Sequence, residues 1–172
     1  MTRESKPVER PCILAEVAQM KPDGKPLILV DLREKIPWVF SPAVDVQRAT
    51  IGTADYTLAG MSSEICIERK SKNDLIMSVA SKERERFFDS CRRMMDYEHR
   101  LIVVECYPSD IWGASYRSQA SPLSVMASTW AIWTDYKVPT LWCENARDAA
   151  RQVEWMLTRF WKRMQLKMKE SA

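Results

Sequence analysis

The sequence of 172 residues contains few glycines, one histidine and no long apolar segment. With 4 glycines it is neither collagen-like nor of low complexity, and its 46% of hydrophobic residues is too high for a disordered chain. No apolar run approaches the roughly 20 residues that cross a bilayer, and no apolar stretch of signal-peptide length follows the polar first residues, so we expect no signal peptide. We therefore expect a soluble, cytoplasmic protein of one domain without membrane contact.

Cysteine and histidine form no metal-binding motif. The 5 cysteines are widely spaced and include no CxxC pair, so we expect reduced and mostly buried thiols. The single histidine, His99, leaves no His/Cys cluster for zinc. Neither a GxGxxG motif nor a P-loop occurs, which argues against nucleotide binding or motor activity.

The charges are nearly balanced, with a net charge of +3. This value permits a nucleic-acid partner without indicating one. The excess lies in residues 151–170, which hold six basic and two acidic side chains. These cations either contact a phosphate backbone or stabilise the negative end of a helix dipole.

Apolar runs and their periodicity predict an α/β domain. The continuous apolar run 27–30 ends at Asp31, as in a strand buried on both faces. The expected strands are 27–31, a half-buried strand 44–51, 63–68, 101–105 and 138–143. The expected helices are 12–20, one capped by Ser71, 82–97, 122–135 and a long one from Asn145 through 164. The early strands suit an antiparallel meander and the later alternation suits parallel crossovers, so we predict a mixed β-sheet flanked by helices on both faces.

Three of the strands end on or near an acid, namely Asp31, Glu68 and Glu105. Asp55 lies in a turn between them, and Glu68 and Lys70 share a face because they are two residues apart on one strand. An aspartate followed by Glu-x-Lys is typical of Mg²⁺-dependent phosphodiesterases. Carboxylates are the hard ligands that Mg²⁺ takes, the metal lowers the pKa of a bound water, and an ammonium group stabilises the transition state. The alternative is a solvated strand edge with a salt bridge.

Further motifs surround this pattern. LVDLRE at 29–34 looks like V-D-x-R-E, Asp55-Tyr56 matches the end of G-D-Y, and ERKSKND at 68–74 matches E-R-K-x-x-x-D. RFFD at 86–89 is similar to an arginine-led helix, and LIVVE at 101–105 to a buried strand ending in glutamate. Together these motifs resemble the nuclease domain of the XPF-type structure-specific endonucleases, in the PD-(D/E)xK, restriction-endonuclease-like superfamily. The resemblance covers nearly the whole chain after residue 27.

The resemblance implies a metal site and a substrate site. The ligands of the metal, Mg²⁺ or Mn²⁺, would be Asp55 and Glu68, with Asp31 as a further acid. Lys70 would position the attacking water. The remaining matches would organise the phosphate, complete the motif or contact the substrate: Arg33, Glu34, Arg69, Asp74 and Arg86.

Several of these residues have a structural alternative. An acid such as Asp74 in the first turn of a helix stabilises that helix without catalysis. Arg33 with Glu34 is equally well a structural ion pair, and Arg86 lies in KERERF, a charge run typical of a solvated helix face. Glu105 stays outside the predicted site.

Three features depart from the family. Ala54 stands at the glycine of G-D-Y, and Ser90 stands where a glutamine commonly follows the arginine-led helix. Archaeal and eukaryotic members usually carry a tandem helix-hairpin-helix module for DNA binding and dimerisation, for which these residues leave no room. We predict an N-terminal extension (1–26), a nuclease domain (27–165) and a basic tail (166–172), and a partner protein that targets DNA is an open alternative.

The favoured hypothesis is a metal-dependent DNA endonuclease that cuts branched, flap or fork DNA during repair, recombination or replication. A non-catalytic DNA-binding or scaffold subunit with the same fold is the main alternative, and a nuclease for RNA or single strands is another. Six of the 7 tryptophans lie in residues 112–161, where they fill a core or a dimer interface or stack on unpaired bases. We expect a homodimer through the C-terminal helices, in a compact bacterial or phage protein.

Overall fold

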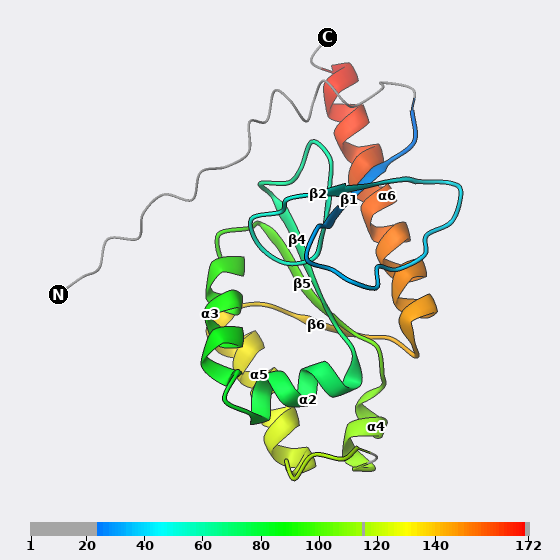
Figure 1. The fold of residues 1–172 in the computed structure, drawn as a ribbon. Helices are drawn as coiled ribbons and strands as arrows, with labels where there is room; N and C mark the ends of the chain where they lie inside the picture. Colours follow the sequence, from blue (N-terminus) through cyan, green and yellow to red (C-terminus); the bar gives the residue numbers. More distant parts are fainter. Residues whose placement is uncertain (1–23, 115, 171–172) are drawn as a thin grey trace, which may run out of the picture.

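The computed structural model describes residues 24–114 and 116–170. Its strands are β1 (Leu27–Asp31), β2 (Asp45–Ala49), β3 (Tyr56–Leu58), β4 (Ile65–Lys70), β5 (His99–Val104) and β6 (Thr140–Trp142). Its helices are α2 (Lys72–Ala80), α3 (Arg84–Met94), α4 (Pro108–Trp112), α5 (Pro122–Tyr136) and α6 (Ala146–Glu170) (Figure 1). The predicted mixed sheet with flanking helices is confirmed.

The strands lie in the order β2-β1-β3-β4-β5-β6. The β1–β2, β4–β5 and β5–β6 pairs are parallel, whereas β3 runs against both of its neighbours, β1 and β4. Because β3 is reversed, its first residue lies at the same edge of the sheet as the last residues of β1 and β4. This topology brings segments that are distant in the sequence to one edge.

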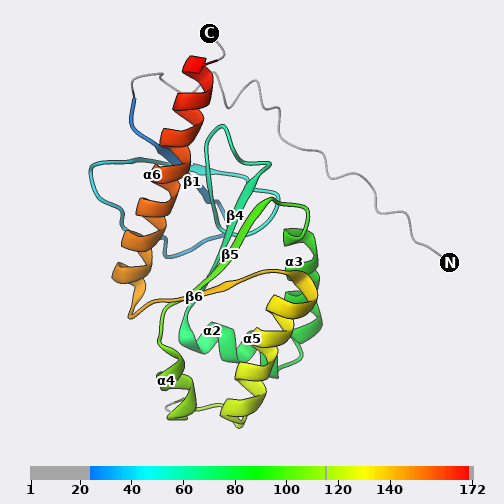
Figure 2. The same cartoon turned by 180° about the vertical axis from the view of Figure 1, so that it is seen from behind.

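Side-chain alternation along β4 divides the core into two layers. Ile65 and Ile67 pack in the layer that contains α6, whereas Cys66 packs in the layer that contains α2, α3 and α5. The long α6 covers one face of the sheet and the other helices cover the opposite face (Figure 2). A strand that is covered on both faces reads as a continuous apolar run, which is why this part of the sheet was predictable.

Two predicted helix starts are confirmed by their caps. The Ser71 hydroxyl accepts a hydrogen bond from the backbone N–H of Asp74 at 3.2 Å, at the start of α2. The Asn145 side chain accepts from the N–H groups of Arg147 and Asp148, both at 3.0 Å, at the start of α6. Each cap satisfies donors that the first turn of a helix leaves without a partner.

Other predictions about the elements are wrong. The early strands form no simple meander, since residues 32–44 return along the sheet and β2 pairs in parallel with β1. β2 is also mostly exposed rather than half-buried, because it is an outer strand. β3 and α4 have no predicted counterpart, since 3 and 5 residues are too few to show a period. The last helix is longer than expected, since α6 continues past residue 164 to Glu170, and the division of the chain into extension, domain and tail stays a prediction.

Some expectations concern residues outside the described ranges, namely the helix 12–20 and Cys12. Within the described ranges, Cys66, Cys91, Cys106 and Cys143 are free and buried, which confirms the expectation for these thiols. None of the helices in this part of the chain combines the length and the apolar composition that a bilayer span requires.

Candidate active site

Three predicted acids lie in one row across the sheet. The strand register places Asp55 beside Asp31 on one side and beside Glu68 on the other, one position beyond the paired residues. The N–H of Asp31 donates to the Asp55 carbonyl at 2.8 Å, and the N–H of Asp55 donates to the Ile67 carbonyl at 3.0 Å. Opposed residues on antiparallel strands have Cβ atoms about 5 Å apart. The reversed strand β3 therefore gathers the three acids at one edge of the sheet.

Asp55 is a strongly perturbed carboxylate. It accepts a hydrogen bond from the backbone N–H of Arg69 at 2.8 Å. Burial, and then the neighbouring charge of Glu68, raises the pKa of Asp55 to about 7. Both causes disfavour the charged form, the first by removing water and the second by repulsion. Such a carboxylate gains from a nearby cation, and shifts of this kind are concentrated at functional sites.

Glu68 and Lys70 form the ion pair that their spacing predicts. Lys70 Nζ lies 2.7 Å from Glu68 Oε1, and both side chains are mostly buried. Burial lowers the pKa of Lys70, but the charge and hydrogen bond of Glu68, together with the charge of Asp55, outweigh burial and raise that pKa above its usual value. Lys70 is therefore an ammonium group at neutral pH. Its Nζ also lies 4.6 Å from the centre of the Phe87 ring, in a cation–π contact.

Asp31 is buried and anchors an exposed arginine. Arg33 Nε donates to Asp31 Oδ1 at 2.6 Å, and the N–H of Ile51 donates to Oδ2 at 2.9 Å. Burial raises the pKa of Asp31, but the hydrogen bonds from Arg33 and Ile51 outweigh burial and hold that pKa below its ordinary value. The hydrogen bond to Asp31 raises the pKa of Arg33, and the charges of Asp55 and Glu68 add to this. With 71% of its side chain exposed, Arg33 can meet an anion beside the acids.

Asp55 and Glu68 fit a hard divalent cation. They offer carboxylate oxygens from neighbouring positions at the edge of the sheet, where burial and then the charge of Glu68 raise the pKa of Asp55. Mg²⁺ keeps several waters and takes only one or two carboxylates from the protein. The described residues hold no group of three or more Asp, Glu, His or Cys side chains arranged to bind a metal. Both Asp31 oxygens already accept hydrogen bonds, so a metal role for Asp31 stays a prediction.

Arg69 projects to the opposite face of β4 and binds Glu105. Arg69 Nε donates to Glu105 Oε1 at 2.6 Å, and Nη2 donates to Oε2 at 3.3 Å. Trp38 Nε1 donates to the same Oε1 at 2.6 Å. This contact fastens the segment 32–44 to the ends of β4 and β5.

Glu34 joins this group rather than the row of acids. Glu34 Oε1 lies 3.4 Å from Arg69 Nη1. The alternative of an Arg33–Glu34 ion pair is wrong, since Arg33 pairs with Asp31 instead. Glu105, which the sequence leaves outside the site, is the acceptor that Arg69 and Trp38 share on this face. The only sign of this role in the sequence was the position of Glu105 at the end of a buried strand.

Asp74 lies on α2 and Arg86 on α3, and the charge of Asp74 contributes to the raised pKa of Lys70. The Ser71 hydroxyl donates to Asp74 Oδ2 at 2.7 Å, a contact that holds this acid at the start of α2. The Arg86 side chain is 87% exposed and pairs with Glu83 at 3.3 Å on α3, as on a solvated helix face. Their roles toward substrate stay predictions.

Ala54, at the position of the glycine of G-D-Y, has a left-handed backbone conformation. Its φ is 69°, in the left-handed region that favours glycine. The chain thus keeps the turn that leads into Asp55 and β3, at the cost of placing a side chain in a strained conformation.

The model of the ERCC4 domain matches residues 30–156. The chain belongs to the ERCC4 domain family. The match runs from the end of β1 into α6 and includes the row of acids, Lys70 and Glu105. This result confirms the XPF-type resemblance that the motifs predict.

Relatives of this ERCC4 domain include repair endonucleases. It is 30% identical over 139 residues to DNA repair endonuclease XPF from Mus musculus, covering 74% of this chain and 14% of that protein. It is 28% identical over 138 residues to 3′-flap repair endonuclease Xpf from Saccharolobus solfataricus, covering 77% of this chain and 55% of that protein. The chain therefore spans about half of one relative's length and a small part of the other's.

Solved structures confirm the fold of this ERCC4 domain. XPF from Aeropyrum pernix matches with a TM-score of 0.62 at 26% identity, over 84% of this chain and 69% of that one. The same protein in complex with DNA matches with a TM-score of 0.62 at 26% identity, over 81% and 66%. The fold is that of an XPF nuclease domain, and the homology is to XPF-family DNA repair endonucleases.

Proposed function

We propose that this ERCC4 domain is a metal-dependent DNA endonuclease that hydrolyses phosphodiester bonds in branched, flap or fork DNA. The observation that carries the proposal is the Glu68–Lys70 ion pair beside the half-buried Asp55, at the edge where β1, β3 and β4 meet. Placing two carboxylates and an ammonium group together in a mostly buried position costs free energy, and a scaffold role does not require that arrangement. The names of the two relatives and the DNA complex of the Aeropyrum pernix protein support the choice of substrate.

Each residue of the site has a distinct task in this proposal. Asp55 and Glu68 hold Mg²⁺ or Mn²⁺, which when bound neutralises charge on the phosphate and lowers the pKa of a water. Lys70 is protonated, so it orients the attacking water and stabilises negative charge on the phosphate rather than accepting a proton. Arg33, anchored at Asp31, binds a phosphate oxygen through charge-assisted hydrogen bonds.

We also infer that the chain acts as a homodimer through its C-terminal helices. On α5, the side chains of Leu123, Trp130 and Trp133 are 60%, 49% and 61% exposed. Large aromatic side chains gathered on one exposed helix are typical of protein interfaces. We therefore propose that a second copy of the chain covers these side chains of α5.

Cleavage of end-labelled flap, fork and plain duplex DNA with Mg²⁺ or Mn²⁺ tests the nuclease proposal. We expect cutting that EDTA abolishes and that the double variant Asp55→Asn, Glu68→Gln loses about 10³-fold. Asp45→Asn, an exposed acid on β2, is the matched control and keeps its activity.

Binding without cutting under either metal would overturn the proposal in favour of a scaffold. Cutting that survives the double variant would place the active site elsewhere. Cutting of RNA or single strands alone would replace the proposed substrate.

A further inference from the structure

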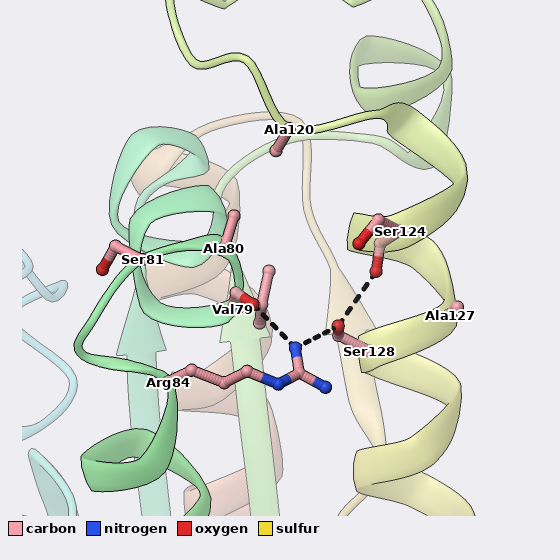
Figure 3. A pocket seen from close by; sticks show the side chains of 8 residues that line it. All are labelled: Val79, Ala80, Ser81, Arg84, Ala120, Ser124, Ala127 and Ser128. Carbon is pink, nitrogen blue, oxygen red and sulfur yellow. Dashed lines mark hydrogen bonds between the residues drawn. The ribbon is translucent and has the colours of Figure 1, made fainter.

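A cavity of about 480 Å³ lies between the end of α2 and the starts of α3 and α5 (Figure 3). Its walls carry small side chains, among them Ala80, Ser124 and Ala127. Arg84, the first residue of α3, reaches across toward α5 (Figure 3). One water takes about 30 Å³ in the liquid, so a group as large as a phosphate can enter.

Arg84 is held by neutral groups. Its Nη1 donates to the Val79 carbonyl at 2.7 Å and to the Ser128 hydroxyl at 2.8 Å. Its guanidinium carbon lies 4.5 Å from the centre of the Phe88 ring. Among the described residues no carboxylate forms an ion pair with Arg84, although carboxylates do so with Arg33, Arg69, Arg86, Arg92 and Arg151. The charge of Arg84 is therefore fixed in position without being neutralised.

The start of α5 also favours an anion. α5 begins beside Ser121, whose hydroxyl accepts from the N–H of Ser124 at 3.2 Å, and its first turn carries no acid, whereas α3 begins at Arg84 between two acids, Glu83 and Glu85. The N-terminal ends of helices carry partial positive charge. The opposing negative end of α2 is countered by the bond from Arg84 to the Val79 carbonyl. The guanidinium of Arg84 and the start of α5 are thus the features of this cavity that suit an oxyanion.

We propose that this cavity binds a backbone phosphate of the DNA that the Asp55–Glu68 site cleaves, a proposal that rests on the proposed function. α2 begins two residues after Lys70 and ends at the cavity, and its 9 residues span about 13 Å at 1.5 Å per residue. Phosphates on one DNA strand are spaced about 3.4 Å along the helix axis. The second phosphate contact therefore lies about four nucleotides from the cleaved bond.

The salt dependence of DNA binding tests this site. Binding of fluorescent fork and duplex DNA is measured by anisotropy without metal, on the full chain carrying Asp55→Asn and Glu68→Gln so that no cleavage occurs. Each phosphate contact contributes about 0.9 to the slope of log K against log salt. We expect Arg84→Gln to reduce the slope by about 0.9. Arg92→Gln removes the same charge from the same helix outside the cavity and leaves the slope unchanged.

A second variant covers the chance that Arg84→Gln disturbs the end of α2. Ser124→Glu places a carboxylate in the cavity wall, and it creates a capping box with Ser121 that favours the start of α5. We expect Ser124→Glu to reduce the slope of log K against log salt by the same amount as Arg84→Gln. Gln47→Glu on the exposed strand β2 adds the same charge outside the cavity and is the control.

Slopes equal to that of the unsubstituted protein for both cavity variants would overturn the inference. A weakened dimer at an unchanged slope, measured by sedimentation, would also overturn it and assign the cavity to a second copy of the chain. Cleavage by the protein without these substitutions is measured separately: absence of cutting overturns the proposed function, whereas the slopes alone decide the cavity.

Discussion

Asp31 and Asp55 are neighbours on adjacent strands, yet their pKa values are shifted in opposite directions. Burial disfavours the charge of each side chain. At Asp31, hydrogen bonds from Arg33 and Ile51 outweigh that effect. At Asp55, the charge of Glu68 adds to it. A cation would therefore stabilise the charged form of Asp55 as Arg33 stabilises that of Asp31. The opposite directions of the two pKa shifts thus distinguish Asp31, which anchors Arg33, from Asp55, which we propose binds the metal.

We expect Asp55→Asn to stabilise the metal-free protein at alkaline pH. The pKa of Asp55 rises from 3.8 to about 7 on folding, so the folded state holds the proton more tightly and stability falls as pH rises through this window. Asparagine removes that loss, and its amide oxygen still accepts from the N–H of Arg69. Part of the shift comes from the interaction with Glu68, so we expect the free energy of unfolding of the variant to be higher by about 2 kcal/mol. This difference raises the Tm at alkaline pH by about 5 °C.

Thermal melts in EDTA across this pH window measure the effect. The difference between variant and unsubstituted protein should vanish near the ordinary pKa of aspartate, and Asp89→Asn on the exposed side of α3 should show no such trend. A variant that melts below the unsubstituted protein at alkaline pH would contradict the raised pKa.

We expect Lys70→Met to slow cleavage by about 10²–10³-fold while DNA affinity changes little. Methionine keeps the length of the side chain and its contact with Phe87, but removes the ammonium group that pairs with Glu68. Single-turnover cleavage and binding are measured on the same fork DNA. Lys72→Met, which removes a lysine from the start of α2, is the matched control. An equal loss of cleavage rate in both variants would mean that Lys70 acts only by attracting DNA through its charge.

At the scale of elements, residues 32–44 depend on one buried acid. Glu105, at the end of β5, accepts hydrogen bonds from Arg69 on β4 and from the Trp38 indole in this segment. Trp38 also stacks on Tyr56 of β3, with ring centres 4.4 Å apart. Because Arg33 and Asp31 lie where this segment begins, its attachment positions the substrate side of the site.

We expect Glu105→Ala to lower the Tm by about 4–8 °C, because it leaves Arg69 and the Trp38 N–H without their acceptor. Breaking one side of a mostly buried pair costs about 2 kcal/mol here, less than in a fully buried pair. The double variant Arg69→Met, Glu105→Ala should lose less than the sum of the single changes, since no unpaired charge is left. Thermal melts measure these differences, with Glu83→Ala as an exposed control, and strict additivity would contradict the contact.

At the scale of the whole molecule, metal binding and folding are linked. The two carboxylates that would hold the metal come from Asp55, just before β3, and from Glu68 on β4, and these segments meet only in the folded sheet. A ligand that binds only the folded state stabilises it, by about 2.7 kcal/mol at a hundredfold excess over Kd.

We therefore expect saturating Mg²⁺ or Mn²⁺ to raise the Tm by about 5–10 °C and EDTA to reverse the rise. Differential scanning fluorimetry measures it without any DNA. The double variant Asp55→Asn, Glu68→Gln should show no rise. An equal rise in that variant would mean that the metal binds elsewhere.

The proposed dimer is tested at the same scale. We expect Trp133→Glu, which places a charge on the exposed face of α5, to shift the protein from dimer to monomer in sedimentation experiments. Gln47→Glu on β2 should leave the dimer intact. A monomeric unsubstituted protein, or a variant that still dimerises, would contradict an interface on α5.

The sequence by itself determined the features that depend on residues close together in the chain. Glu68 and Lys70 pair because a strand places every second side chain on one face. Ser71 and Asn145 cap helices because their side chains reach N–H groups two or three residues on. The E-R-K-x-x-x-D motif is equally local, so the residues alone predict the family and the Glu68–Lys70 part of the site.

Only the tertiary structure decided which distant residues meet. β3 is too short to show a period, yet its reversed direction places Asp55 between Asp31 and Glu68. Glu105 binds Arg69 and Trp38 across separations of 36 and 67 residues, which no local pattern reports. Arg84 faces Ser128 across 44 residues for the same reason. Strand register and helix packing set these contacts, because they depend on how whole elements pack rather than on the residues beside each one.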